Sequence, residues 1–122
     1  MIADDSVIAV NGNFCTVDRL NSKQLIYGKN GLTFLERVEY NRGLGILVET
    51  KYNSIIVSPH QKFVTEQGIV TASELTTEDY LLTSDDEYEQ LVNKIHLKDV
   101  FDMFKPVTRD STFKANGFVL LT

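Results

Sequence analysis

Few side chains in this sequence could act as nucleophiles, acids or metal ligands. There is one cysteine, Cys15, and there are two histidines, His60 and His96. A thiol can act as a nucleophile, and an imidazole that titrates near neutral pH can act as a general acid or base. Cys15 has no second cysteine with which to form an internal disulfide or a zinc–thiolate site, and the histidines lie far apart in the sequence. We therefore expect neither a metal nor a cofactor.

Composition and charge narrow the class of protein. The 122 residues include 12 basic and 17 acidic side chains, a net charge of −5, with no cluster of lysine and arginine. A nucleic-acid-binding surface needs such a cluster to follow the phosphates. The apolar runs, such as Ile55–Val57, are too short to span a membrane, and Asp4 and Asp5 stand where a secretory signal would be basic and then apolar. We expect one soluble, cytoplasmic, monomeric domain over residues 1–122 that binds neither nucleic acid nor a membrane.

Short β-strands must position these residues. Runs rich in valine, isoleucine, threonine and aromatic residues alternate with Asn, Gly, Ser and Asp. The pair Asn11-Gly12 predicts a tight hairpin turn, because asparagine and glycine adopt its backbone conformation readily. Three hairpins are expected between residues 6 and 72. They pair Ser6–Val10 with Phe14–Val17, Leu44–Thr50 with Ile55–Ser58, and Gln61–Thr65 with Ile69–Ala72.

The remaining sequence continues the all-β pattern. The acidic stretch Ser84–Gln90 is interpreted as a solvated loop. Leu91–Val100 fits both a helical stripe and an extended segment, and a strand is favoured. No repeat with a fixed period is visible, and the number of strands favours a barrel, a sandwich or a folded-over β ribbon. Further strands are expected at Tyr80–Thr83, Val100–Met103 and Phe118–Leu121, with a turn region over Pro106–Ser111.

Three separated stretches carry a combined pattern. Met1–Ile8 begins the chain, Ser58–Thr65 is followed by a strand and the step Ala72-Ser73-Glu74-Leu75, and Phe101-Asp102 leads to a closing run that ends at Thr122. In order and spacing they resemble the sequence blocks of the Hint domain of inteins, bacterial intein-like domains and hedgehog proteins. The resemblance covers nearly the whole chain and implies a horseshoe-like, all-β fold with pseudo-two-fold halves. Nothing in the chain resembles a homing endonuclease insertion.

The resemblance implies a site for self-processing at the upstream junction. In the family, a thiol or hydroxyl on the first residue attacks the carbonyl before it, and a histidine polarises or protonates the scissile amide. Met1 stands at the first position, and its thioether has no proton to lose. With Ser58 aligned to the Thr or Ser that opens the middle block, Gln61 takes the histidine position. His60 is one residue earlier, and on a strand it would face away from the site.

The downstream junction departs from the family as well. There the family carries a histidine and an asparagine whose side-chain amide attacks its own carbonyl, and the resemblance places Leu121 and Thr122 at these positions. A threonine hydroxyl cannot form the cyclic imide. Asp102 matches an aspartate that coordinates the two cleavages in many inteins, but the interpretation as a solvated or turn-capping aspartate is favoured.

These departures predict a naturally degenerate Hint domain that keeps the fold and has lost protein splicing. Its role would be that of a structural or interaction module, with a flanking or host polypeptide as its partner and a phage or other mobile element as its context. Two alternatives stay open: an active self-processing domain that uses a displaced residue such as Cys15 or His60, and a small-molecule-binding β-barrel unrelated to inteins. For Cys15, a small buried core residue is the simpler interpretation.

Overall fold

The computed structural model describes all residues from 1 to 122, and nearly every element in it is a β-strand. Two short 3-10 helices, η1 and η2, complete the set, and no helix is long and apolar enough to cross a membrane. In chain order the elements are β1 (Ile2–Ala3), β2 (Val7–Val10), β3 (Asn13–Thr16), η1 (Val17–Arg19), β4 (Leu25–Gly28), β5 (Gly31–Glu49), β6 (Ser54–Val57), β7 (Lys62–Thr65), β8 (Gly68–Thr71), η2 (Ala72–Glu74), β9 (Tyr80–Leu82), β10 (Tyr88–Gln90), β11 (Asn93–Thr108), β12 (Thr112–Ala115) and β13 (Phe118–Leu121).

All strand pairs are antiparallel and form one continuous network. Its order is β10-β9-β7-β13-β12-β2-β4-β5-β11-β1-β6, with β3 added on β2 and β8 on β7. The three expected hairpins are present as β2–β3, β5–β6 and β7–β8. Gly12 in the first turn has φ +79°, a backbone conformation that favours glycine. The predicted all-β class and these hairpins are therefore confirmed.

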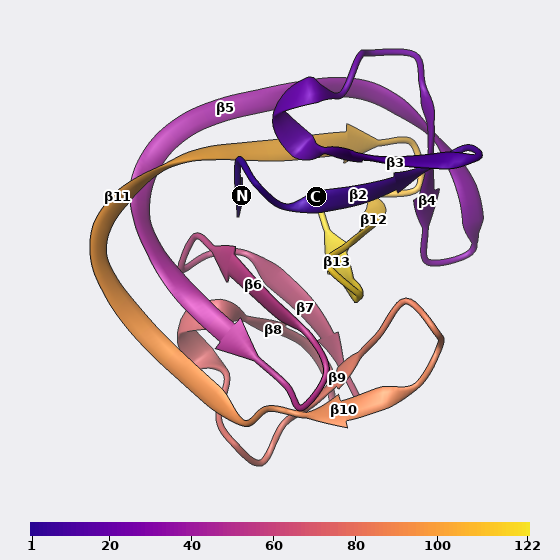
Figure 1. The fold of residues 1–122 in the computed structure, drawn as a ribbon. Helices are drawn as coiled ribbons and strands as arrows, with labels where there is room; N and C mark the ends of the chain where they lie inside the picture. Colours follow the sequence, from indigo (N-terminus) through magenta and orange to yellow (C-terminus); the bar gives the residue numbers. More distant parts are fainter.

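The longest elements, β5 and β11, form a curved ribbon along the outside of the molecule (Figure 1). The ladder shifts register between His96 and Val100, and such a bulge bends the strand that carries it. Gly45 allows the side chains of Ile56 and Phe101 to lie close against the ribbon, because a Cβ there would lie 2.7 Å from Ile56 and 3.0 Å from Phe101. The ribbon thereby curves around a core to which both halves of the chain contribute.

Two halves of the chain repeat the same order of elements at a constant offset. β2 begins at Val7 and β7 at Lys62, 55 residues later, and β3 with η1 repeats as β8 with η2 at the same offset. Corresponding strands have the same burial pattern, residue by residue: β2 matches β7, and β3 matches β8. The implied pseudo-two-fold halves are confirmed. The repeat is invisible in the sequence because hairpin geometry, rather than residue identity, is what the halves share.

The core lies between the halves and consists of aliphatic and phenylalanine side chains. The rings of Phe63 on β7 and Phe118 on β13 meet edge to face, with their centroids 5.8 Å apart. Both are fully buried, as are Ile8 on β2 and Ile26 on β4. The strands that carry the two ends of the chain are thus fixed against the centre of the molecule.

Two expectations need correction. The acidic stretch is not wholly a loop, because Tyr88–Gln90 forms β10 and pairs with β9. Glu89 points inward there, and its carboxylate accepts hydrogen bonds from Thr50 Oγ1 at 2.6 Å and Asn53 Nδ2 at 3.1 Å. The expected turn from Pro106 begins later, since β11 runs to Thr108. A proline without an N–H is tolerated there because β1 pairs with β11 only at Met103 and Phe104, which leaves that edge free at Pro106.

The two ends of the chain lie beside each other inside the arc of β5 and β11 (Figure 1). β1 is held between β11 and β6, with Ile2 opposite Phe104 and Val57. β13 pairs with β7, with Leu121 opposite Lys62. The start of β1 and the end of β13 therefore meet at the turn that joins β6 to β7.

Candidate functional site

The backbone nitrogen of Met1 marks the centre of the site. It donates hydrogen bonds to Ser58 Oγ and to Gln61 Oε1, each at 2.9 Å. The carbonyl of Met1 in turn accepts a hydrogen bond from the backbone nitrogen of Ser58 at 2.8 Å. The first residue of the chain is therefore fixed on both sides by the turn between β6 and β7.

Gln61 connects the two ends of the chain. Its Nε2 donates to the carbonyl oxygen of Leu121 at 2.8 Å and to that of Lys62 at 3.1 Å, while its Oε1 accepts from Met1. The side chain is only 2% exposed, so its polar atoms depend on these partners rather than on water. One amide group thus links the junction at Met1 to the junction at Leu121.

The turn that presents Gln61 is built by its own backbone. The nitrogen of Gln61 donates to the carbonyl of Ser58 at 3.1 Å, and the nitrogen of Ala72 donates to the carbonyl of Gln61 at 2.8 Å. The carbonyl of Pro59 accepts from the nitrogen of Ser73 at 3.0 Å. Contacts from η2 therefore hold the turn from outside while Gln61 points inward.

A hollow of about 360 Å³ opens over this arrangement. His60 is among the residues that line it, and the expectation that strand alternation would turn His60 away loses its premise. The reason is that β7 begins only at Lys62, and Pro59 and His60 belong to the turn. The residues that line the hollow are Met1, Asn41, Ser58, His60, Gln61, Lys62, Lys105, Leu121 and Thr122.

Burial changes the acid–base behaviour of the α-amino group of Met1. Removal from water, together with the positive charge of Lys105, lowers the pKa of this group from 8.0 to about 5. The amine is therefore neutral at pH 7. In this state it donates hydrogen bonds to Ser58 and Gln61 without a buried positive charge.

The residues expected at the downstream junction lie in the same hollow. Leu121 is the last residue of β13, and the nitrogen of Thr122 donates to the carbonyl of Ser111 at 3.0 Å. Both residues are partly buried. Six of the seven expected site positions, namely Met1, Ser58, His60, Gln61, Leu121 and Thr122, are thus brought together.

Asp102, the seventh expected position, lies outside the hollow. It sits on β11, where its carboxylate accepts a hydrogen bond from the Tyr40 hydroxyl at 2.6 Å and pairs with Arg42 Nε at 3.3 Å. The hydrogen bond to Asp102 raises the pKa of Tyr40. Asp102 is thus not a turn cap: it lies within β11, its side chain is 46% exposed to solvent, and side chains of the neighbouring strand β5 engage it.

Cys15 is also remote from the hollow at Met1. It lies on the edge strand β3, half-buried against the core, and lines a separate hollow with Asp4, Asp5 and Asp18 among others. Burial and the nearby charge of Asp18 raise the pKa of the thiol, which disfavours the nucleophilic thiolate. No three His, Cys, Asp or Glu side chains are grouped so that they could hold a metal ion.

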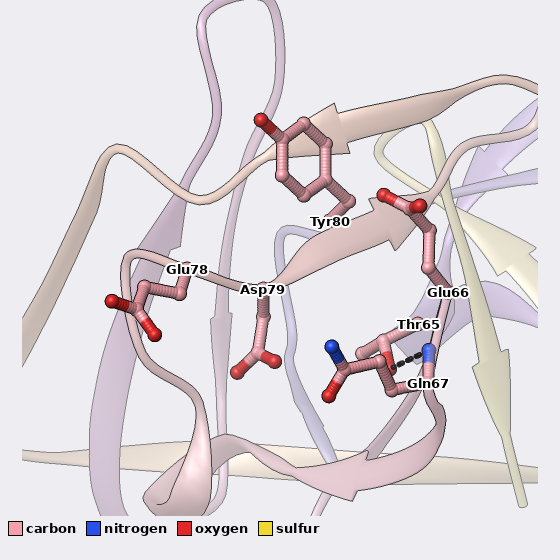
Figure 2. A pocket seen from close by; sticks show the side chains of 6 residues that line it. All are labelled: Thr65, Glu66, Gln67, Glu78, Asp79 and Tyr80. Carbon is pink, nitrogen blue, oxygen red and sulfur yellow. Dashed lines mark hydrogen bonds between the residues drawn. The ribbon is translucent and has the colours of Figure 1, made fainter.

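A smaller acidic hollow was not foreseen from the sequence. Glu66 and Gln67 reach it from the β7–β8 turn, and Glu78, Asp79 and Tyr80 reach it from the approach to β9 (Figure 2). Its volume is about 150 Å³. Asp79 caps its own turn by accepting a hydrogen bond from the Thr76 nitrogen at 2.8 Å. These carboxylates fit a solvated turn region.

Comparisons with known proteins find matches in structure but none in sequence. No family model matches the sequence, and no curated protein matches it. Solved structures match over almost the full length. The gp41-1 intein superposes with a TM-score of 0.93 at 14% identity, covering 99% of this chain and 97% of that one. A DnaB intein from Synechocystis sp. PCC 6803 gives a TM-score of 0.93 at 18% identity, covering 99% and 96% of the two chains.

A third match has the same extent. The Msm DnaB1 intein splicing domain, solved with bound zinc, gives a TM-score of 0.87 at 13% identity and covers 100% of both chains. These identities are low, so the likeness concerns the path of the backbone. Together with the paired halves and the meeting of the chain ends, it establishes that this chain has the Hint fold of inteins.

Proposed function

We propose that this chain is a Hint domain that has lost self-processing and serves as a structural or interaction module. One observation carries the proposal. Gln61 joins the nitrogen of Met1 to the carbonyl of Leu121 in a centre whose first residue offers no nucleophile. The architecture that would hold two scissile junctions is kept, while the groups that would cleave them are replaced.

The upstream reaction needs two groups that these residues do not supply. The first is an acyl acceptor, and the thioether of Met1 has no proton to release when it attacks a carbonyl. The second is an acid that gives a proton to the departing nitrogen. Gln61 faces that nitrogen with its oxygen, because its Nε2 is bound to Leu121 and Lys62. It therefore accepts a hydrogen bond where catalysis requires a donor.

The downstream reaction also lacks the side chains that it needs. Leu121 and Thr122 carry neither an imidazole nor a side-chain amide that could cyclise. The carbonyl of Leu121 is instead held by Gln61, and the nitrogen of Thr122 is held by Ser111. Both ends are therefore clamped, which suits a domain that connects to a flanking polypeptide without cutting it.

The alternative function is an active self-processing domain that relies on His60. The observation in its favour is that His60 lines the same hollow as Met1. Cys15 has no such support, because it lines a different hollow and has a raised thiol pKa. On either reading the partner would be a flanking or host polypeptide in the cytoplasm of the host cell, with a phage or other mobile element as the source.

The test is the intact mass of the domain with a short peptide fused before Met1 and another after Thr122. After a day with and without a thiol reductant, we expect the mass to stay unchanged. Loss of a flanking peptide would overturn the proposal. If that loss disappears in His60→Ala but persists in Cys15→Ser, it would establish the alternative.

A further inference from the structure

The dipeptide Asn-Gly occurs three times in the chain, each time where one strand turns back into the next. Asn11-Gly12 lies between β2 and β3, Asn30-Gly31 between β4 and β5, and Asn116-Gly117 between β12 and β13. An asparagine side chain before glycine can react with the backbone of its own chain, because glycine has no Cβ to shield its nitrogen. The three copies have the same chemistry but different surroundings.

Asn11 and Asn30 are free to react. Both residues are exposed, and the side chain of neither makes a hydrogen bond within the protein. A Cβ built on Gly12 or on Gly31 would meet no atom within 4 Å, so both glycines border open space. Nothing in the fold therefore holds these two asparagine side chains away from the glycine that follows them.

Asn116 has the same neighbour but is held in place. Its Oδ1 accepts a hydrogen bond from the backbone nitrogen of Val7 at 2.7 Å, and its Nδ2 donates to the carbonyl of Ser54 at 3.0 Å. Gly117 is enclosed as well, because a Cβ there would collide with the side chain of Asn53. A reaction that displaces the side-chain amide of Asn116 must disrupt these hydrogen bonds.

Asn21 separates the effect of the following residue from the effect of the surroundings. Asn21 is exposed and its side chain makes no hydrogen bond within the protein, as at Asn11 and Asn30, but Ser22 follows it. The side chain of Ser22 crowds the backbone nitrogen that would attack. Asn21 thus has the freedom without the glycine, and Asn116 has the glycine without the freedom.

We propose that Asn11 and Asn30 are sites at which the chain modifies itself by deamidation, and that the contacts of Asn116 protect the third copy. At each site the backbone nitrogen of the glycine attacks Cγ of the asparagine. A new N–C bond closes a five-membered imide, and the side-chain nitrogen leaves as ammonia with the proton of the glycine nitrogen. Water then adds to either carbonyl of the imide and opens the ring, which gives aspartate or isoaspartate.

This reaction differs from the processing chemistry and goes beyond the proposed function. Here the backbone attacks the side chain, so the chain stays intact. Each conversion replaces a neutral amide with a carboxylate, and conversion of both sites takes the net charge from −5 to −7. The protected copy is the one whose side chain ties its turn to Val7 on β2 and to Ser54 on β6. The fold thus confines the modification to asparagine side chains that support no other element.

The test follows these four asparagines as the 122-residue protein ages. The folded protein is kept for several days in mildly alkaline buffer, a second sample is kept in urea, and tryptic peptides of both are analysed by mass spectrometry. In the folded protein, we expect Asn11 and Asn30 to react at least about tenfold faster than Asn116, the factor to which two hydrogen bonds of usual net strength correspond. In urea the three Asn-Gly copies should react at similar rates, and Asn21 should stay slow in both samples.

Two results would overturn the proposal. One is equal rates at all three Asn-Gly copies in the folded protein, which would mean that the contacts of Asn116 do not protect it. The other is reaction of Asn11 and Asn30 in urea but not in the folded protein, which would mean that their turns are protected as well.

Variants locate the modification. The double substitution Asn11→Gln with Asn30→Gln keeps both amides and the net charge, but glutamine would have to close a six-membered ring, which is far slower. Ion-exchange chromatography of the aged protein should show acidic forms in the unmodified protein and none in the double variant. The matched control, Asn21→Gln, should accumulate acidic forms at the rate of the unmodified protein. Acidic forms that persist in the double variant would contradict the assignment.

Discussion

The two halves of the chain place different residues at the same structural position. Ser6 precedes β2 as Gln61 precedes β7, and each lies 55 residues from the other in an otherwise matching set of contacts. The nitrogen of Ser6 donates to the carbonyl of Ala3 at 3.0 Å, as that of Gln61 does to Ser58 at 3.1 Å. The carbonyls of Ser6 and Gln61 each accept from the first residue of the following 3-10 helix, at 2.8 Å in both cases.

Their side chains nevertheless behave differently. Gln61 uses its amide to connect both ends of the chain, whereas the hydroxyl of Ser6 is fully buried and has no hydrogen-bond partner. The neighbouring strands explain the difference. β7 pairs with β13, which carries the end of the chain, while β2 pairs with β12. A duplicated scaffold therefore makes a site only where the chain ends arrive and a side chain is long enough to reach them.

The largest predicted effect is a dependence of the free energy of unfolding on pH, caused by the Met1 α-amino group, which has no counterpart at Ser6. The α-amino group of Met1 has a pKa of about 5 in the folded protein against 8.0 ordinarily, so the unfolded chain binds more protons between these values. The free energy of unfolding should be fully retained above pH 8 and fall as the pH drops from 8 to 5. Three pKa units correspond to at most about 4 kcal/mol. Urea denaturation across this range measures the decline.

N-acetylation of Met1 is the control for this prediction, because an amide nitrogen does not titrate. The difference in unfolding free energy between free and acetylated protein isolates the amine from every other titrating group. A difference that stays constant from pH 8 to pH 5 would contradict the buried neutral amine.

The next effect is the loss of Gln61. Gln61→Ala removes hydrogen bonds to Met1, Lys62 and Leu121 and leaves buried polar atoms without partners, which should lower the free energy of unfolding by about 3 kcal/mol. Chemical denaturation measures it. Gln67→Ala, at an exposed position in the β7–β8 turn, should change stability by less than about 0.5 kcal/mol. Equal effects of the two substitutions would break the comparison.

A smaller effect is expected at Glu89, which ties β10 to the β5–β6 turn. Glu89→Ala should cost about 2 kcal/mol, because Thr50 and Asn53 lose a charged acceptor. Glu87→Ala, at an exposed neighbour, serves as the control and should be nearly neutral. If both substitutions prove neutral, the hydrogen bonds of Glu89 to Thr50 and Asn53 do not stabilise the fold and this prediction is wrong.

The smallest effect is predicted at Ser6. Ser6→Ala removes a buried hydroxyl that has no partner, so the free energy of unfolding should rise by about 1 kcal/mol or less. Thermal unfolding of Ser6→Ala and of Gln61→Ala measures whether the two substitutions change the free energy of unfolding in opposite directions. Destabilisation by Ser6→Ala would mean that the hydroxyl has a role in the fold, and the contrast between the halves would then fail.

Local features of the fold could be predicted from the sequence, and long-range ones could not. The Asn11-Gly12 turn specifies its hairpin through backbone conformation alone, which is a property of two residues. The length of β5 could not be predicted, because along the ribbon apolar side chains such as Leu44 are exposed and Gly43 and Gly45 interrupt the alternation. The ribbon depends on pairing with β11, which begins more than forty residues after β5 ends.

In the site, too, the features set by neighbouring residues could be predicted and the long-range contacts could not. Alignment to a family pattern placed Gln61 at the junction, and the structure has it there. For His60, strand alternation was applied before the strand begins, because Pro59 and His60 form a turn and β7 starts only at Lys62. The contacts of Asp102 with Tyr40 and Arg42 cross between β11 and β5 at a separation of about sixty residues. No local pattern in the sequence contains that information.

One measurement tests most directly whether the site keeps its geometry and lacks only its reactive groups. The double substitution Met1→Cys with Gln61→His is made in a domain that carries an upstream peptide, and release of this peptide by a thiol is followed by mass spectrometry. The account predicts release from the double variant and none from Met1→Cys alone or from the unmodified domain. A double variant that unfolds cooperatively and still retains its upstream peptide would contradict it.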